Sequence, residues 1–77
     1  MPVEYSDLTI EGWRDGFKKI SFTHLLQREA GLGLGDAKHI TDKVVDGQQV
    51  RVKIPTHRRD SFIDEAKALG VRDVQID

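Results

Sequence analysis

The sequence predicts an α+β domain with the element order β-α-α-β-α-β, in which three helices pack on one face of a three-stranded, mainly antiparallel sheet. Segments of alternating apolar and polar residues, typical of half-buried strands, lie at residues 8–13, 48–55 and 73–77. The segments between them carry apolar residues at helical spacing, and a glycine-rich stretch divides the first of these segments into two helices.

The N-terminal residues are expected to form a lead-in over 1–7, followed by a single domain over 8–77. In the first strand, Leu8 and Ile10 are expected to face the core, and the polar residues between them to face solvent. Gly12 interrupts this alternation, and we expect a helix to approach the strand closely where the side chain is missing.

A helix is predicted over residues 18–30 because Phe22, Leu25 and Leu26 follow the i, i+3, i+4 spacing of one helix face. Ser21 is the residue type that caps helix N-termini, so we expect it to cap this helix. The spacing leaves other residues of this segment, including an isoleucine, on the opposite and exposed face.

The stretch 30–38, with the sequence AGLGLGDAK, is expected to form the bend of an αα-hairpin. Glycine reaches positive φ without strain, so it ends one helix and lets the chain reverse. Leu32 and Leu34 are expected to plug the end of the helix pair. Asp36 is expected in the first turn of the second helix, over 36–45, where its charge suits the helix dipole.

The clearest strand is 48–55, which has one apolar face and one basic face. The sheet is therefore expected to have one covered face and one solvated face. Thr56 is expected to cap the third helix, Phe62 to lie on its apolar stripe, and Gly70 to end it.

Composition excludes several classes of function. The formal net charge of −1 gives no global field that would favour nucleic acid or an anionic membrane. The chain has no cysteine, which suits a reducing compartment, and we expect a cytoplasmic location. Neither a signal peptide nor an apolar run of membrane-spanning length is evident, so no membrane partner is expected.

No motif for catalysis or cofactor binding is legible. His24, His39 and His57 fall on three different predicted helices, and no pair has the i, i+4 spacing of a helical metal site. The alternating glycines of the bend follow a helix rather than a strand and lack the G-x-G-x-x-G frame of a dinucleotide site. We therefore expect a non-enzymatic protein without a cofactor or metal.

The bend carries a resemblance to a known family. Lys19-Ile20, followed by Gly-Leu-Gly-Leu-Gly-Asp-Ala-Lys over 31–38, resembles the C-terminal domain of the bacterial ribosomal large-subunit stalk protein. That domain has a Thr-Gly-Leu-Gly-Leu-Lys-Glu-Ala-Lys signature between its first two helices and the same element order. The resemblance covers residues 8–77. Because the sequence has no counterpart of the family's dimerising N-terminal domain and hinge, we expect a free-standing relative.

The resemblance implies a function. In the family this domain is not an enzyme and binds GTP-dependent translation factors through an exposed patch on its first two helices. Carried over by position, the resemblance places the partner-binding patch at the following residues: Ile20, Thr23, His24, Gln27 and Lys38. Ile20 and Lys38 keep the family's character, whereas the other three differ in charge or polarity.

Two other functions stay open. The small size and the absence of a ribosomal tether also suit an immunity or inhibitor protein that neutralises a toxin, for example one that acts on translation. A secondary, basic patch is expected from Arg51, Lys53, Arg58 and Arg59, and it would bind RNA or an acidic protein surface. A solvated face is the more ordinary interpretation of such charges, so we do not expect nucleic acid to be the main partner.

Overall fold

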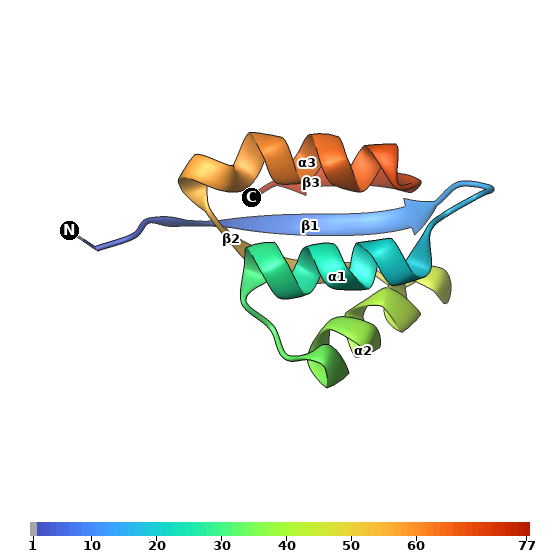
Figure 1. The fold of residues 1–77 in the computed structure, drawn as a ribbon. Helices are drawn as coiled ribbons and strands as arrows, with labels where there is room; N and C mark the ends of the chain where they lie inside the picture. Colours follow the sequence, from blue (N-terminus) through green and yellow to red (C-terminus); the bar gives the residue numbers. More distant parts are fainter. Residues whose placement is uncertain (1) are drawn as a thin grey trace.

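The computed structural model describes residues 2–77, so Met1 of the expected lead-in lies outside the described residues. The elements, in chain order, are β1 (Tyr5–Trp13), α1 (Lys19–Ala30), α2 (Leu34–Val45), β2 (Val50–Pro55), the 3-10 turn η1 (Thr56–Arg58), α3 (Arg59–Ala68) and β3 (Val71–Ile76). This order is the predicted one, and Figure 1 shows its path through space.

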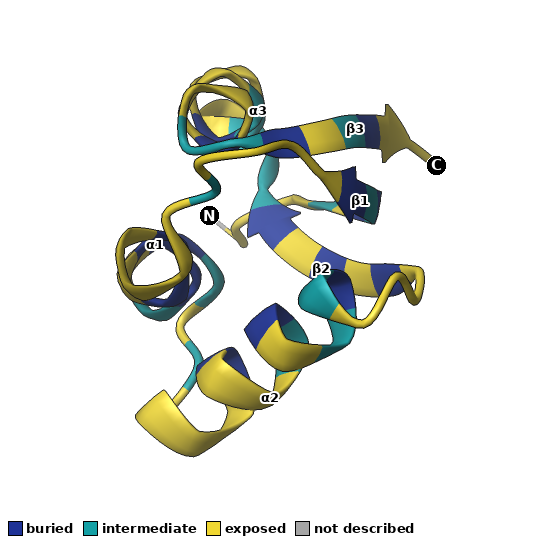
Figure 2. Ribbon diagram, turned by 90° about the vertical axis from the view of Figure 1, so that its right-hand side faces the viewer, coloured by how far each residue is buried: buried dark blue, intermediate teal, exposed yellow. Residues whose placement is uncertain are grey.

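The sheet has the strand order β2-β1-β3, and both neighbours run antiparallel to the central strand. Leu8 of β1 lies opposite Val52 of β2 and Ile76 of β3. All three helices lie on the same side of the sheet (Figure 2). The predicted α+β fold is therefore confirmed, because each helix places its apolar stripe against one apolar sheet face.

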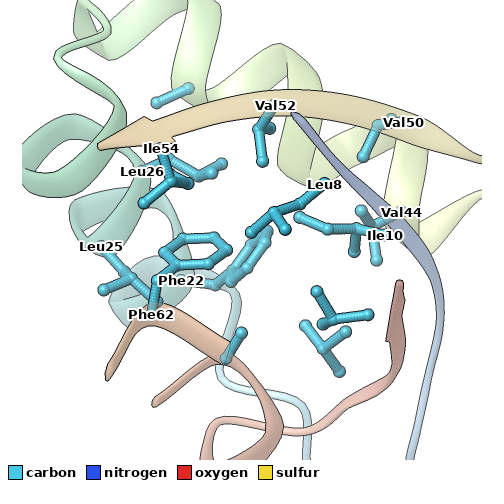
Figure 3. Close-up of a cluster of buried hydrophobic side chains, with 14 residues drawn as sticks. Leu8, Ile10, Phe22, Leu25, Leu26, Val44, Val50, Val52, Ile54 and Phe62 are labelled. Carbon is cyan, nitrogen blue, oxygen red and sulfur yellow. The ribbon is translucent and has the colours of Figure 1, made fainter. Parts of the chain in front are cut away.

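The core lies between the sheet and the helices (Figure 3). Leu8 and Ile10 project from β1 into this core and are fully buried, as predicted. Phe22 of α1 and Phe62 of α3 meet them from the helix side and are also buried. The alternation along the strands thus decides which face receives the helices.

The first strand begins earlier than predicted and differs at its end. Tyr5 already pairs with Pro55, so residues 5–7 of the expected lead-in belong to β1. The close approach of a helix that we expected at Gly12 is wrong. A Cβ built there would lie 2.7 Å from Cζ of Arg72, so the space is filled by a side chain of the neighbouring strand.

Two predicted helix caps are wrong. Ser21 lies inside α1, whose N-cap position is Lys18, and among residues 2–77 no side chain caps this end. The entry of α1 is held by the backbone instead, because the Lys18 N–H donates to the Leu69 carbonyl over 2.8 Å. Thr56 does not cap the third helix, since its hydroxyl lies 2.8 Å from the Ser6 hydroxyl across the sheet edge.

The glycine-rich bend matches the prediction only in part. Gly31 has a φ of 66° and ends α1 in the left-handed conformation, as predicted. Leu32 packs against the core, but α2 begins at Leu34 rather than Asp36. Leu34 therefore projects outward and does not plug the helix pair. Asp36 still lies in the first turn of α2.

Candidate functional site

Helices α1 and α2 border a groove of about 490 Å³ on the outer surface of the domain. Both helices contribute side chains to it, and the lining residues are Lys19, Ile20, Thr23, His24, Leu34, Lys38, Thr41 and Asp42. The contributors from α2 include Leu34, Lys38 and Thr41, which follow the i, i+4, i+7 spacing of one helix face. The groove is therefore the side of the helix pair that faces away from the core.

Two exposed apolar side chains flank the groove, one on each helix. Ile20 of α1 is 75% exposed and Leu34 of α2 is 59% exposed. A single exposed apolar residue is ordinary on a protein surface. Here two of them line one groove from different helices, so the groove presents apolar surface on both of its sides.

The groove has a polar floor that the sequence interpretation placed elsewhere. Thr23 is only 7% exposed, so its predicted position on the open face is wrong. Its hydroxyl lies 2.8 Å from the hydroxyl of the buried Thr41 on α2, and either of the two can donate to the other. The remaining hydroxyl donates to the carbonyl one turn earlier in its own helix, that of Lys19 for Thr23 at 2.9 Å or that of Ala37 for Thr41 at 3.0 Å. Because both hydroxyls are satisfied, this pair can lie between the helices without an unpaired buried group.

The charged rim of the groove is mainly cationic. Lys19 and Lys38 are exposed on its border and supply two positive charges, and Asp42 supplies one carboxylate. His24 is also exposed on this border. The structure thus brings four of the five predicted patch residues together at one groove. Gln27 is the exception, because it is half-buried and does not line the groove.

The sequence interpretation missed four groove residues: Lys19, Leu34, Thr41 and Asp42. Leu34 was missed because the predicted start of the second helix, at Asp36, left it in the bend. With the helix beginning at Leu34, the spacing of α2 would have placed Leu34, Lys38 and Thr41 on one face. The signal was present in the sequence, but the boundary concealed it.

The secondary, basic patch is divided by ion pairs with carboxylates of the same chain. Arg51 lies 3.2 Å from Asp77, at Oδ2 of the carboxylate, and Arg59 lies 3.3 Å from its neighbour Asp60. Arg58 turns towards α1, away from the strand residues. The four predicted cations therefore do not form one continuous free basic surface.

Arg58 belongs to an ion-pair cluster that joins three elements. Its Nη2 lies 2.7 Å from Oε1 of Glu29, and its Nε lies 3.0 Å from Oε2, which makes a bidentate pair. Arg28 contacts the same carboxylate over 3.2 Å and reaches Glu65 of α3 over 2.6 Å. The cluster thus connects the end of α1 to η1 and α3.

The Glu29 carboxyl is buried, and its protonation responds to this cluster. Hydrogen bonds from Arg58 lower its pKa to about 2, and Arg28 adds to the effect, against the opposing cost of burial. Glu29 is thus ionised at neutral pH and raises the pKa of both arginines through its hydrogen bonds. The cluster has the properties of a structural clamp, because its carboxylate is enclosed by its own partners.

The described residues contain no group of three or more histidine or acidic side chains placed to hold a metal ion. His24, His39 and His57 lie on α1, α2 and η1. Across residues 2–77 the helices are too short and too polar for any of them to span a membrane.

Comparison with known proteins found no protein-family model, curated protein or solved structure that matches the chain.

Proposed function

We propose that this chain is a non-enzymatic protein-binding module whose α1–α2 groove receives a translation factor. The observation that carries the proposal is the pair of exposed apolar side chains, Ile20 and Leu34, on facing helices within a cationic rim. The resemblance of residues 31–38 to the stalk domain supplies the class of partner. A cytoplasmic location follows from that partner.

The free energy of binding would come first from the apolar pair. Full burial of an isoleucine or leucine side chain stabilises a complex by about 1.5–3 kcal/mol. Lys19 and Lys38 would meet carboxylates around the apolar contact of the partner, which accelerates association and fixes its register. The hydrogen-bonded threonine pair holds the two helices in place before binding, so little ordering is needed.

The test is a titration of the labelled chain with purified GTP-dependent elongation factors, read by fluorescence anisotropy. The double variant Ile20→Asp/Lys38→Glu is expected to bind at least about tenfold more weakly, because an apolar contact becomes a desolvated charge. The matched control is Ile76→Asp/Lys67→Glu, which makes the same changes at exposed positions outside the groove.

The control is expected to bind within about twofold of the unchanged chain. Equal affinities for the groove variant and the unchanged chain would remove the groove as the binding surface. The inhibitor alternative predicts a different partner for the same titration. If a single toxin binds stoichiometrically and the elongation factors do not, the translation factor is the wrong partner.

A further inference from the structure

The β2 edge of the sheet offers a second binding surface, whose lining residues are distinct from those of the groove. Because the strand order is β2-β1-β3, β2 and β3 are the two edge strands, and each has a hydrogen-bonded neighbour on one side only. An edge strand presents a row of unpaired backbone N–H and C=O groups, to which another chain can add as a further strand.

The register identifies which backbone groups are free. The Thr56 N–H donates to the Glu4 carbonyl over 2.8 Å, and antiparallel ladders alternate strictly along the strand. Val50, Val52 and Ile54 are therefore the β2 residues whose backbone groups face β1. The backbone groups of Arg51 and Lys53 point outward, and no hydrogen bond from residues 2–77 reaches them.

A pocket of about 510 Å³ lies directly beside these two residues. The sheet and the bend both contribute to its lining, which consists of Tyr5, Ala30, Leu32, Ile40, Arg51, Val52 and Lys53. Leu32 and Ile40 are only partly buried against the core, so apolar surface remains open to a ligand. The edge therefore combines free hydrogen-bonding groups with an apolar cavity.

We propose that the outer edge of β2 binds an extended acidic segment of a partner protein, which adds to the sheet as an antiparallel fourth strand. Residues opposite one another in a sheet project from the same face. Partner residues opposite Arg51 and Lys53 would thus lie on the solvated face, where a carboxylate fits beside the Lys53 ammonium and can share the Arg51 guanidinium with Asp77. The residue between them would share the face of Val52 and enter the pocket beside Leu32.

The positive charges of β2 favour an acidic partner over a second copy of the chain as the occupant of this edge. Antiparallel pairing of two β2 edges would bring Arg51 and Lys53 of one copy against those of the other. Like charges placed opposite one another destabilise a strand pair, and lysine on an edge strand is a common protection against self-association. The recognised pattern is accordingly acidic–apolar–acidic, as in alternating glutamate and valine.

The test uses a fluorescein-labelled peptide with five alternating residues, Glu-Val-Glu-Val-Glu, and the full chain. N-methylation of its glutamate amides removes the hydrogen bonds to the edge but keeps every charge, and it is expected to weaken binding by about tenfold. Lys53→Glu is expected to weaken binding by about three- to tenfold, whereas the control Lys67→Glu on α3 leaves it unchanged. Ile20→Asp should also bind normally, which separates this site from the groove.

Amide hydrogen exchange distinguishes strand addition from simple charge attraction, because only new backbone hydrogen bonds protect particular amides. Saturating peptide is expected to slow exchange at Arg51 and Lys53, while Val52, already bonded to β1, exchanges slowly with or without it. The proposal is overturned if the N-methylated and unmodified peptides bind equally, or if the two amides gain no protection. The proposal also fails if the chain sediments as a dimer in which the Arg51 and Lys53 amides are protected without peptide, because a second copy then occupies the edge.

Discussion

The two sides of α1 differ in how far their side chains are paired or buried within the chain. Towards α3 and η1, the helix ends in a closed cluster in which Glu29 is buried and bonded to two arginines. Towards α2, it leaves Ile20 exposed beside an open groove. The side towards α3 satisfies its charged groups within the chain, which favours stability. The side towards α2 leaves an apolar side chain exposed, where it is available to a partner.

The largest loss of stability is expected on the core side of α1. Leu26→Ala removes a fully buried side chain and is expected to lower the free energy of unfolding by about 2–5 kcal/mol, through lost burial and the cavity left behind. Urea denaturation followed by circular dichroism measures it. A loss below about 0.5 kcal/mol would mean that this side of α1 does not form the core.

Acid should weaken the closed side of α1. The folded pKa of Glu29 lies at about 2, below its ordinary value of 4.5, so its contribution is present above pH 4.5 and is lost as the pH falls towards 2. The expected loss is on the order of 1–2 kcal/mol, because the half-exposed arginines are partly screened by water. Urea denaturation at a series of pH values measures this loss.

Glu29→Gln tests the assignment of that pH dependence. The variant should be less stable at neutral pH and should show a shallower fall between pH 4.5 and pH 2, since the titrating group is gone. The matched control is Glu4→Gln on the exposed N-terminal segment, whose profile should follow that of the unchanged chain. An unchanged slope in the Glu29 variant would assign the acid sensitivity to other carboxyls.

The floor of the groove should contribute a smaller amount. Thr23→Val removes one hydroxyl of the buried pair and is expected to cost about 0.5–1.5 kcal/mol, while Thr41 keeps its bond to the Ala37 carbonyl. Denaturant unfolding of Thr23→Val, Thr41→Val and the double variant forms a cycle. Strictly additive losses would show that the two hydroxyls do not interact.

The smallest effect on stability is expected at the rim. Ile20→Asp should change the free energy of unfolding by less than about 0.5 kcal/mol, because the side chain makes few contacts within the chain. Together with the large loss expected at Leu26, six positions further along the helix, this result would show that only one side of α1 contributes to the core. A large loss would indicate that Ile20 serves the fold rather than a partner.

Most of the fold could be predicted because its signals are local. Alternation at Leu8 and Ile10 identified the buried face of β1, and glycine at 31 marked the end of α1. The helix starts were less predictable. Capping depends on which backbone groups remain unpaired, and at α1 the Leu69 carbonyl holds the entry that Ser21 was expected to cap.

The candidate site was predictable at Ile20 and Lys38, where residue type and spacing both indicated an exposed face. It was not predictable at Thr23, because only the approach of α2 turns that position into a buried contact. The ion pair between Glu29 and Arg58 was not predictable for the same reason, since the two residues are 29 positions apart along the chain.

By itself, the sequence determined the order of the elements, the apolar face of each and the position of the bend, because these depend on periodicity and glycine conformation between near neighbours. Long-range packing decided which polar residues became buried, which cations formed ion pairs and which two strands became the edges of the sheet. Those outcomes depend on distances between segments that are far apart in the chain, and no local pattern records them.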